Sequence, residues 1–489
     1  MASLSTALNI ALSGLTSTSI QSAVVSRNVA SANDPNYSRR VAAMLTLPGG
    51  AVSVASYDRS ADKRLLDKLL DITSLSSGKD ATTAALVELS QTIGDPESDG
   101  SITLLMGKLQ EALRTYEADP GNGNLAASSY QAASSLAQSL NAASAAVQDA
   151  RCAADQAMQS SVTSINALLS QFKVANDAVV RGGGTPSDLA DSLDQRDRIL
   201  KQLSEEIGIR AVTRPNNDIA IYTDSGITLF ETVPRQVTMT PTETFTAGAA
   251  GNPVTIDGER LTGNQTIMGG KAGRLIGLSQ VRDELAVTYQ KQLDEVARGL
   301  ITQFAESDQS DPPSLPDVPG LFTYDGAPAM PASAAAGLAA SLRANMLADP
   351  AKGGNPSLIR DGGFGGSAYI SNTTGAAGYQ GRLSQLIAGL DAPLTFDPAA
   401  QLGLGGSLLT FSAGASGWVE GQRKAAAADS DTNQAMKTRA TDALQRVTGV
   451  NIDEEMSTLL ELEKAYQASA KVMSAVDGML QTLLQAVGN

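Results

Sequence analysis

Few side chains in this sequence are of a type that could carry out chemistry, and the most versatile type is missing. The 489 residues include no histidine and one cysteine, Cys152. Histidine catalysis, histidine-ligated metals, cysteine-based zinc sites and an intrachain disulfide are therefore excluded. Cys152 stands among alanines in a helical pattern, which favours a small packed residue over a reactive thiol.

Three short motifs resemble ligand sites but do not complete the required patterns. Gly269-Gly270-Lys271 resembles a phosphate loop, but Gln265 stands where the first glycine is needed. Asp429 to Asn433 begins like a calcium loop, but Gln434 follows in place of glycine. Asp453-Glu454-Glu455 complements the positive end of a helix dipole more simply than it binds a cation. We therefore expect no enzyme activity, no cofactor and no metal.

The charge of the chain also restricts its partners. The net charge is -15 and the sequence pI is about 4.6. Such a chain repels a phosphate backbone and an anionic membrane surface, so we expect neither nucleic acid nor membrane as a partner. No apolar run is long enough to span a bilayer, and the N-terminus lacks the pattern of a secretory signal peptide.

The two ends of the chain carry apolar residues at alternating steps of four and three, the pattern of a coiled-coil seam. At the N-terminal end the seam is weak in the middle and its polar face is almost uncharged, which indicates contacts on several sides. The predicted interface residues are Leu4, Leu8, Ala11, Leu15, Val25 and Val29, and Ile452, Met456, Leu459, Tyr466, Met473, Leu480 and Leu484. Helices with complementary stripes at both ends would pair.

A turn should follow the first helix at Asn33, Pro35, Asn36 and Tyr37. Pro35 fits the second position of a β-turn, and Asn36 tolerates the left-handed third position of type II. The sequence therefore predicts a positive φ at Asn36, just after the first helix.

The middle of the chain reads as long helices with β segments. Short apolar runs in residues 41–54 predict a hairpin, and residues 125–179 predict one helix roughly 80 Å long. Strand patterns recur between residues 209 and 239, and a helix is expected over 272–304. Residues 311–379 are rich in Gly and Pro and indicate a small mixed or β-rich region.

The predicted fold is mainly α with β-rich parts, in several nested domains. Residues 1–40 and 446–489 would form a terminal helical pairing domain, with coiled-coil packing. Residues 41–308 and 380–445 would form a helical rod domain, with its β segment at about 207–268. Residues 309–379 would form the outer β-rich or mixed domain.

Both ends resemble the flagellar axial proteins of bacteria. At the N-terminal end, Ser26 to Ala30 and Asn33 to Arg39 are similar to that family's signature, with Asn36 where glycine is usual. At the C-terminal end, Gly449 to Glu455 and Ala465 to Val472 resemble the hook-associated protein 1 branch of the family. The resemblance covers about 40 residues at each end and, more loosely, the helical middle.

This resemblance implies a structural subunit at the junction between hook and filament. It implies a ring of copies, with the hook protein, a second hook-associated junction protein and a cytoplasmic export chaperone as partners. It also implies type III export to an extracellular site on the flagellum, and a role in motility. Another flagellar axial protein, such as the hook protein itself, is the alternative; the long helix disfavours it.

Overall fold

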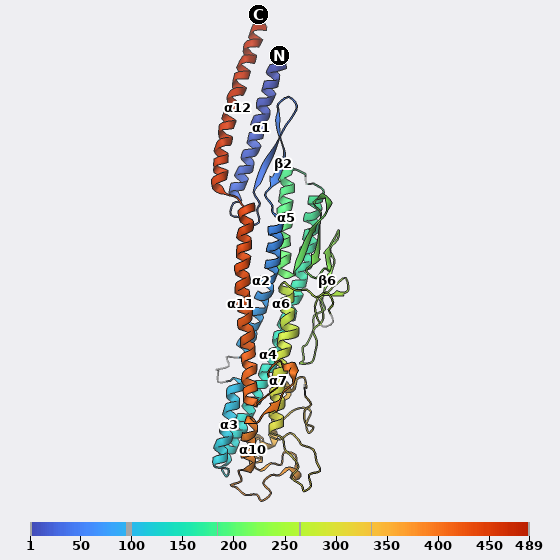
Figure 1. Cartoon of the computed structure of the whole chain (residues 1–489), viewed down its shortest axis with the longest axis vertical. Helices are drawn as coiled ribbons and strands as arrows, with labels where there is room; N and C mark the ends of the chain where they lie inside the picture. Colours follow the sequence, from blue (N-terminus) through green and yellow to red (C-terminus); the bar gives the residue numbers. More distant parts are fainter. Residues whose placement is uncertain (1, 94–99, 183, 264–265, 334, 488–489) are drawn as a thin grey trace.

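The chain forms an elongated molecule with both termini at one end (Figure 1). The computed structural model describes residues 2–93, 100–182, 184–263, 266–333 and 335–487. Helices run along the long axis, and the small sheets lie beside them (Figure 1). The chain travels away from the end that carries the termini and then returns to it, so the first and last helices meet.

Helices dominate the fold, as the spacing of apolar residues predicts. Within the described residues, none of them combines the length and apolar character needed to cross a membrane. The helices are α1 (Ala2–Ala30), α2 (Lys63–Ile93), α3 (Ile102–Ala118), α4 (Gly123–Val180), α5 (Pro186–Glu206), α6 (Arg274–Gln280), α7 (Ala286–Gln303), α8 (Leu338–Ser341), α9 (Leu358–Asp361), α10 (Gly381–Asp391), α11 (Leu408–Thr448) and α12 (Ile452–Val487).

The longest helix, α4, confirms the predicted rod. It has 58 residues, and the Asn122 side chain caps its start by accepting a hydrogen bond from the backbone N–H of Asn124. Shortly after its end, Gly182 adopts a φ of 85°, which a residue with a side chain rarely does. The next helix begins with a capping box at Thr185 and with Pro186 in its first turn, as the sequence indicates.

Two hydrophobic cores follow one another along α4. Leu140 and Val147 lie in the first core, which α4 forms with α3, α7, α10 and α11. Leu169 and Phe172 lie in the second core, with α5, α6 and strands of the β segment. A single straight helix therefore connects two separately packed regions, which gives the middle of the molecule its rod shape.

Buried charges separate these two cores. Arg282 is fully buried in η2 (Val281–Leu285), a π-helical turn between α6 and α7. Its guanidinium donates to Asp155 of α4 at 2.5 Å and to Asp283 at 2.8 Å. Arg151, also on α4, donates to the carbonyl oxygens of Arg282 and Ala249, and burial lowers the pKa of Arg151. Each buried cation is thus satisfied, as such burial requires.

The strands form small antiparallel sheets rather than one large sheet. The predicted hairpin is β1 (Arg40–Thr46) paired with β2 (Val52–Arg59), with a bulge at Ala43/Met44. The strands predicted between residues 209 and 239 are confirmed in two sheets of three strands. The remaining strands are β3 (Ile209–Thr213), β4 (Ile219–Thr223), β5 (Thr228–Phe230), β6 (Val237–Thr238), β7 (Thr255–Ile256), β8 (Glu259–Arg260), β9 (Phe322–Thr323), β10 (Arg343–Ala344), β11 (Leu394–Thr395) and β12 (Gly405–Gly406).

The region expected over residues 309–379 lies at the end of the molecule far from the termini (Figure 1). It is mixed rather than β-rich in its described residues, where the only paired strands are the two-residue β9 and β10. Short helices α8 and α9 and several single 3-10 turns make up most of its regular structure. Its many glycines and prolines interrupt both helical and strand hydrogen bonding, which explains this result.

Candidate assembly site

The first and last helices lie side by side and project beyond the rod (Figure 1). The main neighbour of α12 is α1, and the face of α12 that is partly or fully buried carries Leu459, Leu462, Met473, Val476 and Leu480. Ser469 of α12 lies beside Gly14 of α1, where a Cβ atom would be 3.6 Å from its Oγ. The small residue allows a close approach of the two helices.

The hairpin covers another face of α1. Ser17 donates to the carbonyl oxygen of Val52, and the Ser13 hydroxyl accepts from the N–H of Val52. The polar but uncharged back of α1 therefore binds a strand, which confirms the expectation of contacts on several sides. We call α1, the β1–β2 hairpin and α12 the terminal module; the hairpin, which the sequence analysis assigned to the rod domain, thus packs on the terminal helices.

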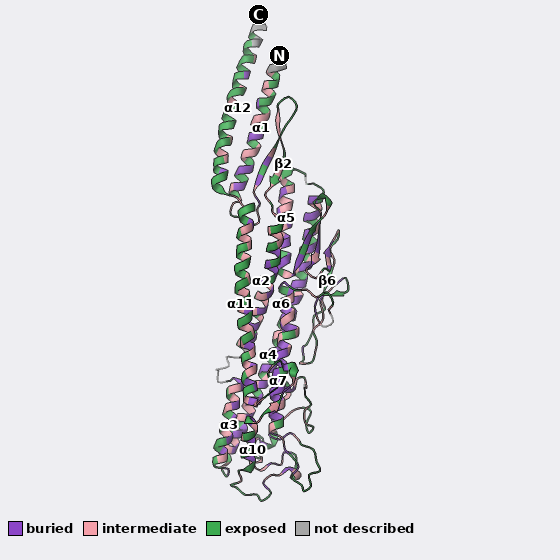
Figure 2. Cartoon of the chain, viewed as in Figure 1, coloured by how far each residue is buried: buried purple, intermediate pink, exposed green. Residues whose placement is uncertain are grey.

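The predicted interface residues differ in their exposure in the single chain. Ala11 and Val25 are buried. Ile452, Met456 and Tyr466 keep 47%, 45% and 49% of their surface exposed, because α1 covers only one face of α12 (Figure 2). The side chain of Leu484 is outside the described part of the chain. The partly buried residues are Leu4, Leu8, Leu15, Val29, Leu459, Met473 and Leu480.

A buried polar hub joins the two helices where they meet the rod. Asn28 of α1 is fully buried, and its Nδ2 donates to Glu455 Oε2 and to the carbonyl oxygen of Arg40, each at 2.9 Å. Its Oδ1 accepts from the Tyr37 hydroxyl at 2.8 Å. Glu455, 1% exposed, also accepts from Arg39 Nε at 2.6 Å. These contacts hold the start of α12, the end of α1 and the turn in one arrangement.

The turn itself differs from the prediction. Asp34 accepts hydrogen bonds from the N–H of Asn36 through its side chain and from the N–H of Tyr37 through its backbone. Asn36 is not among the described non-glycine residues that have a positive φ. The type II turn was therefore wrong: the Asp34 side chain stabilises a turn that needs no left-handed residue. Asn33 and Pro35 are exposed at its surface.

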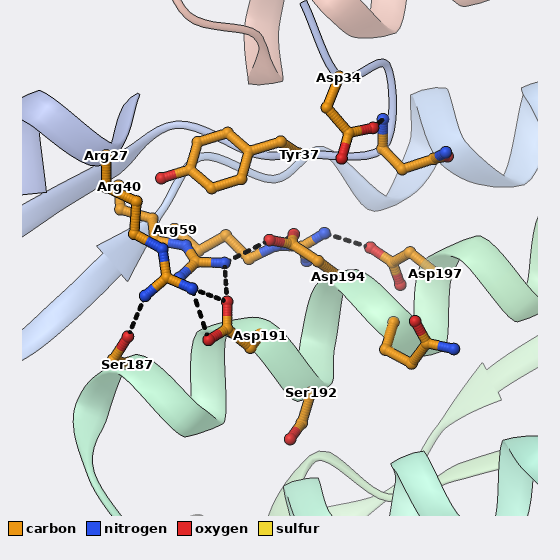
Figure 3. A network of polar contacts seen from close by, with 12 residues as sticks. Arg27, Asp34, Tyr37, Arg40, Arg59, Ser187, Asp191, Ser192, Asp194 and Asp197 are labelled. Carbon is orange, nitrogen blue, oxygen red and sulfur yellow. Dashed lines mark hydrogen bonds and ion pairs between the residues drawn. The ribbon is translucent and has the colours of Figure 1, made fainter. Parts of the chain in front are cut away.

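An ion network attaches the terminal module to α5 (Figure 3). Arg40 Nη2 bonds Asp191 at 2.8 Å and Asp194 at 2.6 Å. Arg59 of β2 bonds Asp194 at 2.7 Å and Asp197 at 2.5 Å.

A third arginine, Arg27 at the end of α1, bonds Asp191 at 2.8 Å and completes this network. Burial by itself would lower the pKa of Arg40, but its hydrogen bonds to Asp194 and Asp191 outweigh that effect and raise the pKa. Three segments of the terminal module are thus anchored on one helix face.

Most of the polar hub and of the ion network was not predicted from the sequence. The sequence analysis singled out Ser26 to Ala30 and Asn33 to Arg39 as parts of a family signature, but it assigned Glu455 only to the helix dipole. A signal was present, since Asp191, Asp194 and Asp197 repeat at steps of three and so share one helix face. Their arginine partners come from sites more than 130 residues away in sequence, and no local pattern identifies them.

In the described part of the chain, the candidate ligand residues have ordinary structural contacts. Lys271 lies just before α6 and donates its backbone N–H to Asp224. Asp429 lies on α11 and pairs with Lys79 at 2.9 Å. Cys152 lies partly buried on α4. These placements agree with the simpler interpretations given above for Lys271, Asp429 and Cys152.

Two family models match the chain. Residues 86–311 match the helical domain of the flagellar hook-associated protein FlgK. Residues 445–486 match the C-terminal region of the flagellar basal body rod proteins FlgEFG. No curated protein sequence matches.

A solved structure, the flagellar hook junction protein FlgK from Burkholderia pseudomallei, is similar at 19% identity with a TM-score of 0.42. That similarity covers 53% of this chain and 46% of that chain, so this chain spans less than half of that protein's length.

Two separate parts of the chain thus match models of flagellar axial proteins, the middle and the C-terminal end. The match over the middle is to the helical domain of the hook-associated protein FlgK. The resemblance seen at the C-terminal end of the sequence is confirmed by the match over residues 445–486.

Proposed function

We propose that the chain is a structural subunit of the flagellum that self-assembles through its terminal module at the junction between hook and filament. The observation that carries this proposal is the set of large apolar residues that stay exposed on the terminal module in the single chain. Figure 2 shows that most of α12 is exposed. The exposed large apolar residues of this module are Ile10, Leu12, Val41, Met44, Leu45, Leu47, Ile452, Met456, Leu460, Tyr466, Val472 and Met479.

Exposed apolar surface of this extent is typical of an interaction site. Burying one such side chain contributes about 1.5–3 kcal/mol, so a second copy packed here would gain substantially. When each copy contacts the next through the same rotation, and the rotation returns to the first copy, the copies form a ring. The match to the helical domain of FlgK supports the position at the hook–filament junction.

The proposed partners follow from this position. They are further copies of the chain in a ring, the hook protein, the second hook-associated junction protein and a cytoplasmic export chaperone. The proposed location is extracellular, on the flagellum, after type III export. The proposed role is not enzymatic and involves neither nucleic acid nor membrane.

A second candidate is another flagellar axial protein, such as the hook protein. One observation favours it: residues 445–486 match a model of rod proteins rather than one of junction proteins. The longer match over residues 86–311 favours the junction.

Electron microscopy of a strain that lacks this chain separates the two candidates. A junction subunit predicts complete hooks without filaments, and full-length chain supplied in trans should restore the filaments. Absence of hooks would identify the chain as a hook or rod component instead. Normal filaments and normal swimming in the deletion strain would contradict both candidates.

A further inference from the structure

A pocket of about 330 Å³ opens beside the ion network, where the terminal module meets α5 and the end of α11. The turn forms one wall through Asn36 and Tyr37, and Leu444 and Thr448 of α11 contribute to another. The charged side chains that line it are Arg59, Lys63, Arg196 and Lys201, and Asp62, Asp67 and Asp197. In a chain of net charge -15, a pocket with more cations than carboxylates is unexpected.

The carboxylates of the pocket already have partners. Asp197 bonds Arg59 at 2.5 Å and Asp67 bonds Lys63 at 2.7 Å. Asp62 accepts the backbone N–H groups of Arg64 and Leu65 at the start of α2. No carboxylate of the described chain that lines the pocket remains for its two other cations.

Those two cations, Arg196 and Lys201, lie on α5 without an ion pair among the described residues. Arg196 is 6% exposed, donates to the carbonyl oxygen of Asn217 at 2.5 Å, and its buried Nε has no hydrogen-bond partner. Lys201 Nζ has one acceptor, Asn36 Oδ1, at 3.3 Å. Burial lowers the pKa of Lys201, and the nearby carboxylates of Asp197, Asp194 and Asp34 offset that effect only in part.

Two carboxylates that have no ion pair among the described residues lie at the same level of the molecule. Asp453 and Glu454 begin α12, five and six residues after Thr448, and are exposed. The hydrogen bonds of these two residues involve their backbones, whereas the neighbouring Glu455 turns inward to the hub. In a ring, copies stand at equal height, so the first turn of one α12 can face the pocket of the next copy.

We infer that the pocket receives the carboxylates of Asp453 and Glu454 from a second copy of the chain, with Lys201 and Arg196 as their partners. This inference rests on the proposed function, because it requires copies side by side in an assembly. It gives the terminal modules a lateral register: apolar contacts supply affinity, and the ion pair selects one alignment.

Zero-length carbodiimide coupling tests the contact directly, because it links an amine to a carboxylate only when the two are in contact. Assemblies would be formed from equal amounts of isotope-labelled and unlabelled full-length chain. We expect a coupled peptide between Lys201 and Asp453 or Glu454, with one half labelled and the other unlabelled. Coupling within one copy only, coupling of Lys201 to another carboxylate, or no coupling of Lys201 in well-formed assemblies would overturn the inference.

Charge exchange provides a second test. Lys201→Glu and Glu454→Lys should each lower incorporation at the junction on the order of tenfold or more, and the double variant should regain most of it. Lys352→Glu, at the far end of the molecule, is the matched control and should have no effect. Failure of the double variant to recover while both single variants fold would overturn the inference. Filaments in the deletion strain would instead overturn the proposed function.

Discussion

At the scale of single residues, Glu455 connects α12 to two earlier segments of the chain in the polar hub. It is almost fully buried and accepts hydrogen bonds from Asn28 on one side and Arg39 on the other. Both donors come from segments more than 400 residues earlier in the chain. The sequence places Glu455 in an acidic triplet whose other two members stay exposed, so only the fold distinguishes it.

Glu455→Ala should loosen the terminal module and leave the rod intact. Removing the carboxylate leaves Asn28 Nδ2 and Arg39 Nε each without one acceptor, which should cost about 3 kcal/mol. Hydrogen exchange on the purified chain would show faster exchange in α1 and α12 and unchanged exchange in α4. Glu461→Ala, exposed on the same helix, is the control. Equal exchange in both variants would contradict the hub.

Asn36 offers a test of the revised turn. Since its φ is not positive, Asn36→Gly should be less stable than Asn36→Ala by about 0.5–1 kcal/mol, because glycine loses more backbone entropy on folding. Both variants lose the amide, so the comparison isolates the backbone. Thermal unfolding and swimming assays of the two variants provide the measurement. A glycine variant more stable than the alanine variant would instead support the left-handed turn predicted from the sequence.

At the scale of elements, α12 has two kinds of apolar position. Val476 is 7% exposed on the face toward α1, whereas Val472 is 51% exposed on the uncovered surface. One helix therefore contacts its own chain with one face and remains available to other copies with the rest. This division explains why the single coiled-coil seam predicted from the sequence does not describe the surface of α12.

Asp substitutions at these two positions should have different effects. Val476→Asp buries an unpaired carboxylate and should separate α12 from α1 in the free chain, at a cost of several kcal/mol. Val472→Asp should leave the free chain unchanged and yet reduce incorporation into the flagellum. Hydrogen exchange on the monomer reports the first effect, and electron microscopy of complemented cells reports the second. If Val472→Asp assembles normally, the exposed face is not an assembly surface.

At the scale of the whole molecule, the ion network sets how the terminal module stands on the rod. The chain crosses this boundary after α1, where the hairpin links it to the rod, and again between α11 and α12. Arg39 also donates its N–H to the carbonyl oxygen of Thr448, which ties one crossing to the other. Asp191 and Asp194 each bond two arginines, and Asp194, which bonds Arg40 and Arg59, is the more buried of the two.

Asp194→Lys should release this arrangement without unfolding either part. Three cations would then meet on one face of α5, and like charges so close repel by several kcal/mol. Small-angle scattering of the free chain should show a broader range of overall lengths than the native chain shows. Asp149→Lys, at an exposed position of α4, changes the net charge equally and should leave the scattering unchanged. Identical curves for all three chains would mean that the network does not orient the module.

The sequence by itself determined the parts of this protein that depend on local spacing. Helices α1, α4 and α12 follow from apolar periodicity, because the interactions behind it join residues three or four positions apart. The sequence also shows directly that histidine is absent and that there is a single cysteine. The signatures at both ends resembled flagellar axial proteins, and the match over residues 445–486 confirms that resemblance for the C-terminal end.

Only the tertiary structure decided how those parts meet. Asn28 and Glu455 contact each other across 427 positions, and Arg40 and Asp194 across 154. Such pairs depend on the path of the whole chain, which spacing does not encode. The turn at Asn36 was misjudged for the same reason: the sequence shows which backbone conformations a residue tolerates, whereas neighbouring groups select among them. The faces of α12 that remain exposed likewise depend on where α1 lies.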